Sequence, residues 1–247
     1  MLAGGAANRG NVLRIGDRVH RPRRKSADVA EALLLHLESV GYELSPRFLG
    51  HDDDGRQVLT FIPGHVHVDQ RPPWIDDDEA NARVLGRLAA VTRELHDATA
   101  GFVPPRGAEP FRPLPLPGSV WNHADVHYGN VVFRGDEPIG LIDWECCAPG
   151  SSMYDPATLL LSARTPRLDR PDHVRRERSA ILAAEAVLTG YRATDAQRST
   201  FHEDIATTFD DVADFIEHED SAYSPSQRAQ APARFRWAAD WWRSRTH

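Results

Sequence analysis

Three side chains in the middle of the chain have the types and the spacing of a metal-assisted transfer site. Asp125 and Asn130 lie five residues apart in the segment HADVHYGN, and Asp143 follows in LIDWE. Carboxylate and amide oxygens are hard ligands that Mg²⁺ accepts, and Mg²⁺ usually takes only one or two carboxylates from a protein. Another carboxylate can orient a hydroxyl group and accept its proton. The three residues therefore predict magnesium-assisted phosphoryl transfer.

The position of these residues relative to two short strands explains their spacing. The runs NVVFR and IGLID flank the turn GDEP, a pattern typical of a hairpin. Asn130 opens the first strand and Asp143 closes the second, so strand pairing brings both to the same end. Asp125 lies on the loop that leads into the hairpin. An isolated Asp or Asn in a loop is more often a turn former, but the combination favours convergence on one metal ion.

Composition narrows the classes of protein that the chain can be. It has 247 residues, 41% of them hydrophobic, and a net charge of −7. This charge argues against a general binder of nucleic acids or membrane surfaces, which would carry a basic excess. No apolar run approaches the roughly 18 residues of a membrane span, and the first residues do not have the pattern of a secretory signal. The two cysteines, Cys146 and Cys147, are adjacent and predict a reduced protein in the cytoplasm.

The first sixty residues are expected to form strands and one helix. NVLRI and RVHR flank Gly16-Asp17, and RFLGH and RQVLTFI flank DDDG, so each pair predicts a hairpin. Between the hairpins, Ser26 is a candidate cap for a helix that ends at Gly41.

Beyond Pro63 the periodicity becomes mostly helical. An apolar stripe from Val84 to Leu95 predicts a helix that begins near Asp76, and further helices are predicted over residues 157–162, 175–191, 201–219 and 227–242. Residues 103–118, with six prolines, predict an irregular connector. We expect an α+β fold with two lobes: a small strand-rich lobe over residues 1–62 and a larger helical lobe over residues 63–247 that carries the loop with Asp125.

The pattern H-x-D-x-x-x-x-N followed by I-D-W resembles the aminoglycoside phosphotransferase and choline kinase-like family, relatives of the protein kinases. The resemblance implies a bilobal protein-kinase-like fold, with a small antiparallel sheet in the N-terminal lobe and a mostly helical C-terminal lobe. It implies that Asp125 is the catalytic base and that Asn130 and Asp143 bind the Mg²⁺ ion. His123 matches a histidine that braces the loop, and Asp155, in SMYDPATLL, matches an aspartate that buttresses it.

The resemblance also implies a nucleotide site, for ATP or GTP, in the N-terminal lobe. The segment FIPG is similar to the connection between the lobes where adenine meets backbone groups, and a glycine-containing turn near the N-terminus is similar to the one that covers the phosphates. The corresponding residues are Phe61, Ile62 and Pro63 for the base, and Gly4, Gly5 and Asn8 for the phosphates.

Two departures from the family pattern concern this nucleotide site. Arg21 stands where a lysine is usual, with Glu31 as its expected ion-pair partner and Lys25, the only lysine, as the alternative phosphate contact. Arginine can grip phosphate with two donors but is not equivalent to lysine. The glycine turn begins at residue 4, so the first strand is expected to be truncated.

The resulting prediction is an ATP-dependent phosphotransferase that acts on a hydroxyl group of a small molecule. The alternative is a pseudokinase that binds nucleotide without turnover. The acidic segment around residues 203–219 could attract a cationic acceptor, but its apolar stripe makes a solvated outer face the better interpretation. The acceptor and the oligomeric state are left open, because one fold can serve many substrates.

Overall fold

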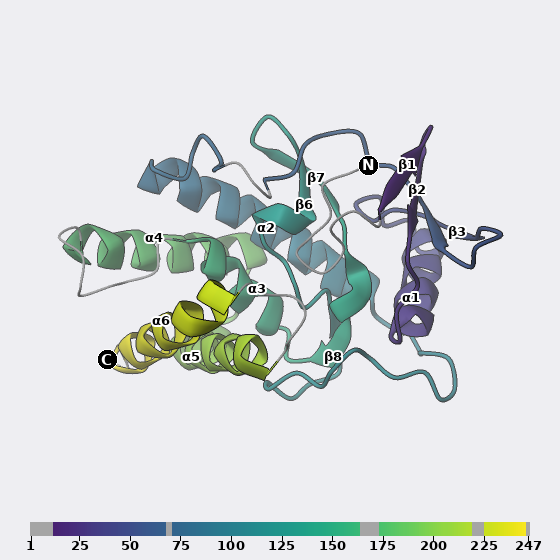
Figure 1. The fold of residues 1–247 in the computed structure, drawn as a ribbon. Helices are drawn as coiled ribbons and strands as arrows, with labels where there is room; N and C mark the ends of the chain where they lie inside the picture. The colour runs from purple at the N-terminus through teal and green to yellow at the C-terminus, as the bar shows by residue number, and fades with distance from the viewer. Residues whose placement is uncertain (1–11, 68–70, 164–172, 219–224, 246–247) are drawn as a thin grey trace.

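The computed structural model describes residues 12–67, 71–163, 173–218 and 225–245. The N-terminal end of the described chain is a four-stranded antiparallel sheet with the order β1-β2-β4-β3. Its strands are β1 (Leu13–Ile15), β2 (Arg18–Arg21), β3 (Phe48–His51) and β4 (Gln57–Thr60). Gly16 turns the first hairpin with a φ of +63°, which glycine adopts without steric cost. Both predicted hairpins are confirmed (Figure 1).

Helix α1 (Ala27–Ser39) lies beside this sheet and buries one apolar face, which includes Val29, Leu33 and Leu37. Ser26 occupies the position before the helix, but its side chain makes no capping hydrogen bond. Its hydroxyl donates instead to the backbone carbonyl of Glu145, 2.9 Å away. The expected cap is therefore wrong, and the serine instead ties the start of α1 to the segment after Asp143.

The segment that follows β4 runs alongside the second hairpin. His65 and Phe133 exchange backbone hydrogen bonds of 3.1 and 2.8 Å, so this connection runs antiparallel to β6. Strands β6 (Val131–Arg134) and β7 (Glu137–Leu141) pair as the sequence predicts. A second, unpredicted pair joins β5 (Val120–Asn122) to β8 (Ala148–Gly150) and brackets the loop and hairpin between them.

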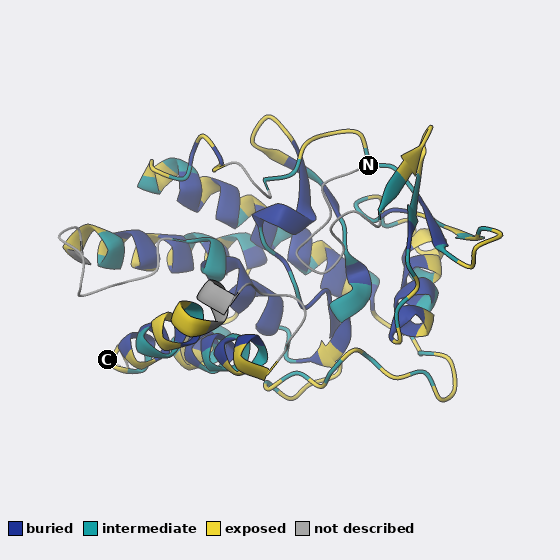
Figure 2. Cartoon of the chain, in the orientation of Figure 1, coloured by how far each residue is buried: buried dark blue, intermediate teal, exposed yellow. Residues whose placement is uncertain are grey.

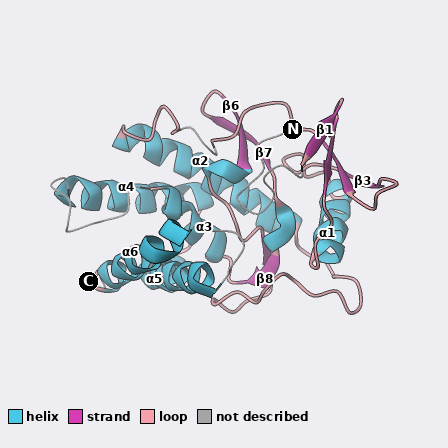
Figure 3. Ribbon diagram, viewed as in Figure 1, coloured by secondary structure: helices cyan, strands magenta, loops and turns pink. Residues whose placement is uncertain are grey.

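Helices fill the opposite end of the molecule (Figures 1 and 3). They are α2 (Asp78–Ala98), α3 (Tyr154–Leu159), α4 (His173–Tyr191), α5 (Asp195–His218) and α6 (Pro225–Arg243), and single 3₁₀ turns cover Tyr128–Asn130, Trp144–Cys146 and Leu160–Ser162. Helices α2 and α4 approach very closely at two glycines. A β-carbon on Gly190 would lie 1.9 Å from the carbonyl oxygen of Gly86.

The buried apolar residues form a cluster that runs from α1 through α2 and the second hairpin into α3 to α6. Figure 2 shows it as the dark faces that the helices turn toward one another. Trp241 and Trp242, near the end of the chain, belong to this cluster. Among the described residues, no helix is both long and apolar enough to cross a membrane. The small sheet and the larger helical part confirm the predicted α+β architecture.

Candidate active site

The loop between β5 and β6 holds Asp125 and Asn130 against each other. The side-chain amide of Asn130 donates to the carboxylate of Asp125 over 2.7 Å and to its backbone carbonyl over 3.0 Å. Both hydrogen bonds use the amide nitrogen, so the amide oxygen of Asn130 is not needed for the contact with Asp125. The spacing of five residues therefore closes the loop and presents one oxygen of Asn130 to another ligand.

The second hairpin brings Asp143 to the same place. Val131 pairs with Leu141, and the amide of Ile142 donates to the carbonyl of Asn130 over 2.9 Å. Asp143 is the next residue and has a positive φ of 68°, which aspartate tolerates better than most residues. The backbone turn directs the chain out of the strand at Asp143. The strand-initial amide and the strand-final acid thus lie at the same end of the hairpin.

Asp125 has the environment of a proton acceptor. Its side chain is 43% exposed, and Nε2 of His127 lies 3.7 Å from it. Desolvation by the surrounding protein raises the pKa of Asp125, and the charge of Asp143 raises it further against the opposing effect of His127. A carboxylate with a raised pKa is a stronger base than an ordinary aspartate. The geometry agrees, because Asn130 contacts the carboxylate of Asp125 with its side chain and the residue before Asp143 with its backbone, so both carboxylates lie at the same end of the hairpin.

His123 joins the loop to the hairpin from inside the protein. Its ring is fully buried, Nε2 donates to the carbonyl of Ile142 over 3.0 Å, and the ring lies 4.7 Å from that of Trp144. A side chain in this position cannot reach an acceptor in the solvent-accessible part of the site. We therefore interpret His123 as a residue that positions the loop relative to Asp143, which agrees with the bracing role that the resemblance implies.

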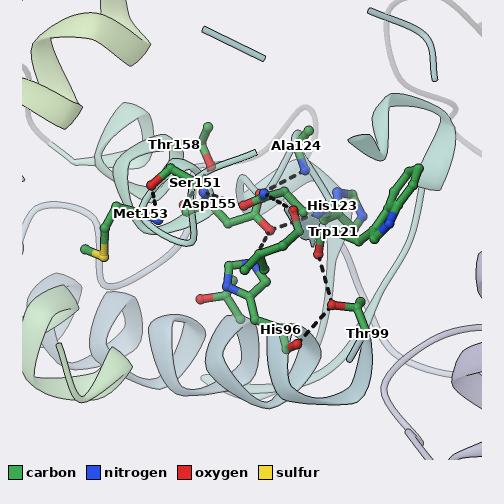
Figure 4. Close-up of polar contacts among 12 residues, drawn as sticks. His96, Thr99, Trp121, His123, Ala124, Ser151, Met153, Asp155 and Thr158 are labelled. Carbon is green, nitrogen blue, oxygen red and sulfur yellow. Dashed lines mark hydrogen bonds and ion pairs between the residues drawn. The ribbon is translucent and has the colours of Figure 1, made fainter. Parts of the chain in front are cut away.

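A buried carboxylate holds the start of the loop (Figure 4). Asp155 is completely buried and accepts hydrogen bonds of 2.8 Å from the backbone amides of both His123 and Ala124. His96 on α2 donates to the same carboxylate over 3.0 Å and contacts the hydroxyl of Tyr191 at 2.8 Å. The buttressing position expected of Asp155 is confirmed by these contacts.

His96 and Tyr191 were not identified from the sequence. Both lie on helices whose apolar stripes predict only packing. The sequence feature that could have identified His96 is its position next to Leu95, on the buried face of a helix. A buried polar side chain normally needs a partner. Such a histidine therefore predicts a buried acid or hydroxyl nearby, although it does not say which one.

The expected partnership of Arg21 with Glu31 is wrong. Glu31 is surrounded by Arg23, His51 and Gln57, at 3.2, 3.0 and 3.4 Å. Arg21 points the other way: its Nη2 donates to Asp143 over 3.1 Å and forms an ion pair with Glu145. Register explains the difference, because His51 and Gln57 on the two neighbouring strands are already directed at Glu31.

The other residues predicted for the nucleotide fall into two groups. Gly4, Gly5 and Asn8 lie outside the described residues. Phe61, Ile62 and Pro63 directly follow β4, where the Phe61 ring stacks under the guanidinium of Arg14 at 3.6 Å and Ile62 packs against Gly140 on β7. The connection thus lies against the second hairpin. Lys25 is exposed on the turn before α1.

Comparison with known proteins places this site in context. Residues 110–195, which include the loop, the hairpin and Asp155, match the model of the phosphotransferase enzyme family. Among solved structures, the amicoumacin kinase hAmiN in complex with AMP-PNP, Ca²⁺ and Ami has a TM-score of 0.61 at 14% identity, covering 93% of this chain and 87% of the other. A choline/ethanolamine kinase family protein from Mesorhizobium loti has a TM-score of 0.57 at 18% identity, covering 96% and 85%.

The chain has the fold of these kinases. The family resemblance inferred from the loop and hairpin is confirmed, and the family match falls on the segment that carries Asp125, Asn130 and Asp143. A curated relative, the trifolitoxin immunity protein of Rhizobium leguminosarum bv. trifolii, is 36% identical over 155 residues, which are 60% of this chain and 55% of the relative. The match therefore spans about half the length of that relative.

Proposed function

We propose that this chain transfers the γ-phosphoryl group of ATP to a hydroxyl group of a small molecule. The observation that carries the proposal is the meeting of the Asp125–Asn130 loop with Asp143 at the end of the hairpin. In this reaction a bond forms between the acceptor oxygen and the γ-phosphorus, and the bond to the bridging oxygen of the nucleoside diphosphate breaks. Asp125 orients the acceptor hydroxyl and takes its proton. The base could equally be guanine, since no residue described here selects for adenine.

The donor set fits a magnesium ion. Asn130 offers its amide oxygen, because its nitrogen is committed to Asp125, and Asp143 keeps one carboxylate oxygen that no described residue contacts. One carboxylate and one amide leave the remaining positions to phosphate oxygens and water, as Mg²⁺ prefers. When bound, Mg²⁺ would neutralise charge on the phosphates. The chain itself holds the two ligands in place through the hairpin register and through His123.

The first sixty-two residues would bind the nucleotide, and residues 63–247 would supply the catalytic loop and the acceptor site. The raised pKa of Asp125 would suit a base that works in the cytoplasm. Because a similar protein is an immunity protein, we include toxic compounds with free hydroxyl groups among the candidate acceptors, next to aminoglycoside-like molecules and other alcohols.

One observation supports the alternative of a nucleotide-binding pseudokinase. Arg21 replaces the usual lysine and contacts Asp143, the proposed metal ligand. If this contact persisted in the presence of nucleotide, it would keep Asp143 from the metal. Binding of Mg²⁺ and ATP without phosphate transfer to any acceptor in a broad panel would favour this alternative.

The test uses the purified chain with MgATP, an acceptor panel, and detection of phosphorylated product by mass spectrometry. Asp125→Asn should lower kcat about 10²- to 10⁴-fold, the usual contribution of a general base, while nucleotide affinity changes little. Asp143→Asn should weaken nucleotide binding in Mg²⁺ but not in its absence. Asp136→Asn, at the other end of the same hairpin, is the matched control and should retain activity. Full turnover in Asp125→Asn would refute the assignment of the base.

The pH dependence gives an independent check. The base must be deprotonated to work, so activity should fall as the pH drops through the pKa of Asp125. Because desolvation, the largest effect, raises that pKa, the acid limb of kcat/KM should lie above the value of about 4 expected for an ordinary aspartate. A limb at or below that value would contradict the environment described for Asp125.

A further inference from the structure

Glu145 lies two residues after Asp143 and reaches back to the N-terminal lobe. It occupies the 3₁₀ turn Trp144–Cys146, and its side chain is only 15% exposed. The carboxylate forms ion pairs with Arg21 on β2 and, over 2.7 Å, with Arg24. Its backbone carbonyl accepts the hydroxyl of Ser26. Three consecutive features of the N-terminal lobe, the end of β2, the turn and the start of α1, therefore converge on this residue.

Arg21 depends on acidic partners because it is buried. Its side chain is 8% exposed, and a buried charge without a counter-charge is strongly destabilising. Within the described chain, its Nη2 atom contacts both Asp143 and Glu145, whereas Glu31 is occupied by Arg23, His51 and Gln57. Among the described residues, neither Nε nor Nη1 of Arg21 donates a hydrogen bond to a carboxylate, and Nη2 donates to Asp143. A guanidinium has a planar fork of five N–H donors, so those donors are available for phosphate oxygens.

We infer that Glu145, rather than the helical Glu31, is the residue that positions Arg21 for the phosphates of the nucleotide. The inference rests on the proposed function. If Asp143 turns to a metal ion, Arg21 loses one of its two acidic partners and keeps Glu145. Glu145 thus holds the guanidinium at one Nη atom while the remaining donors face the nucleotide. Its second partner, Arg24, balances the charge so that the cluster of two acids and two arginines is neutral.

Removal of the charge of Glu145 has a specific consequence for the metal. Arg21 would then have Asp143 as its only remaining carboxylate partner among the described residues, and the two would pair more closely. Mg²⁺ would have to compete with Arg21 for Asp143. A loss of nucleotide affinity that is greatest at low Mg²⁺ and shrinks as Mg²⁺ rises therefore distinguishes a positioning role from a general loss of structure.

The experiment measures binding of the non-hydrolysable analogue AMP-PNP to the full chain by calorimetry at several Mg²⁺ concentrations. Glu145→Gln, which keeps the size of the side chain, should weaken binding about 10- to 100-fold at low Mg²⁺, as expected when a charge-assisted hydrogen bond is removed. Glu145→Asp should lie between this variant and the wild type. The matched control Glu31→Gln should bind within about threefold of the wild type. Equal effects of Glu145→Gln and Glu31→Gln, or no effect of Glu145→Gln, would overturn the inference.

A second measurement does not depend on nucleotide and separates this inference from the proposed function. Thermal midpoints of Arg21→Met, Glu145→Gln and the double variant form a cycle that reports the coupling of the two side chains. We expect a non-additive double variant, and additive shifts for the corresponding cycle with Glu31→Gln. Additive shifts for the Glu145 cycle would overturn the pairing. A wild-type chain that binds no AMP-PNP would refute the proposed function, and the cycles would still decide which acid holds Arg21.

Discussion

The substitution Asp155→Asn tests how the loop that carries Asp125 is held in place. The carboxylate of Asp155 is fully buried and accepts three hydrogen bonds, from the amides of His123 and Ala124 and from His96. An asparagine has one acceptor oxygen and turns its NH₂ group toward one of these donors. Two donors then point at each other, and at least one backbone amide loses its partner in the interior.

The magnitude follows from the number and type of hydrogen bonds that the substitution removes. A hydrogen bond to a charged group contributes about 1.5–3 kcal/mol, and an unsatisfied buried donor costs about 1–3 kcal/mol. Breaking a buried charged pair by changing one partner typically costs about 3–5 kcal/mol. We therefore expect Asp155→Asn to lower the free energy of unfolding by about 3–5 kcal/mol, a large share of the total stability of an ordinary domain.

Urea unfolding at pH 7, followed by tryptophan fluorescence, measures this loss. The control is Asp97→Asn on the same helix as His96, where the carboxylate is 62% exposed and pairs with Arg93; an exposed pair of this kind contributes less than about 1 kcal/mol. A loss for Asp155→Asn no larger than that of the control would refute the reasoning. So would an unchanged kcat in a variant that remains folded, because the loop carries Asp125.

The pH dependence of the stability difference between the wild type and Asp155→Asn tests the contribution of the Asp155 charge. Burial alone would raise the pKa of Asp155, but the hydrogen bonds from His96 and the backbone lower it overall. A carboxyl group whose pKa is lower in the folded state stabilises the fold above its unfolded value of about 4 and loses this contribution as the pH falls through its folded value. The difference in stability between the wild type and Asp155→Asn should therefore shrink below about pH 4.

Two further predictions concern backbone geometry. Ala124 has a φ of +66°, so Ala124→Gly should leave stability unchanged or raise it by up to about 1 kcal/mol, whereas Ala124→Val should lower it. The midpoints of urea unfolding measure both changes. A valine variant more stable than the wild type would contradict backbone strain at this position. The second prediction concerns the contact between α2 and α4. Gly190→Ala places a β-carbon 1.9 Å from the carbonyl oxygen of Gly86, so this substitution should force the two helices apart and lower the free energy of unfolding by about 1–3 kcal/mol. Gly86→Ala, whose β-carbon would lie 3.1 Å from its nearest atom, should cost less, and the reverse order of melting temperatures would refute this packing.

The part of the site that depends on local register could be predicted from the sequence. A strand-initial Asn130 and a strand-final Asp143 on two runs joined by a tight turn can pair in few ways, and the structure pairs Val131 with Leu141 as required. The short loop then leaves Asp125 little freedom. Turn residues and strand alternation are local signals, and they were sufficient for both hairpins of the N-terminal sheet as well.

The interactions that could not be predicted join residues far apart in the sequence. Arg21 and Glu145 are brought together only by the packing of the N-terminal sheet on the 3₁₀ turn after Asp143. Strands β5 and β8 have three residues each, too few for a periodic signal. The competing partners of Glu31 come from β3 and β4, whose register decides where a strand side chain points. Side-chain partners across such distances follow from tertiary packing rather than from residue type.

The acidic helix α5 shows why charge counts alone do not identify an acceptor. Asp214 and Glu217 lie on its outer face, but both pair with Arg236 of α6, and Asp210 pairs with Arg243. A cationic acceptor would have to displace these arginines. Asp211 instead faces inward, where it binds both terminal nitrogens of Arg112 at 2.6 Å and fastens the proline-rich connector to α5. Asp210, Asp211, Asp214 and Glu217 are therefore paired with arginines of the same chain, so the negative charge of this helix is not by itself evidence for a site that binds a cationic acceptor.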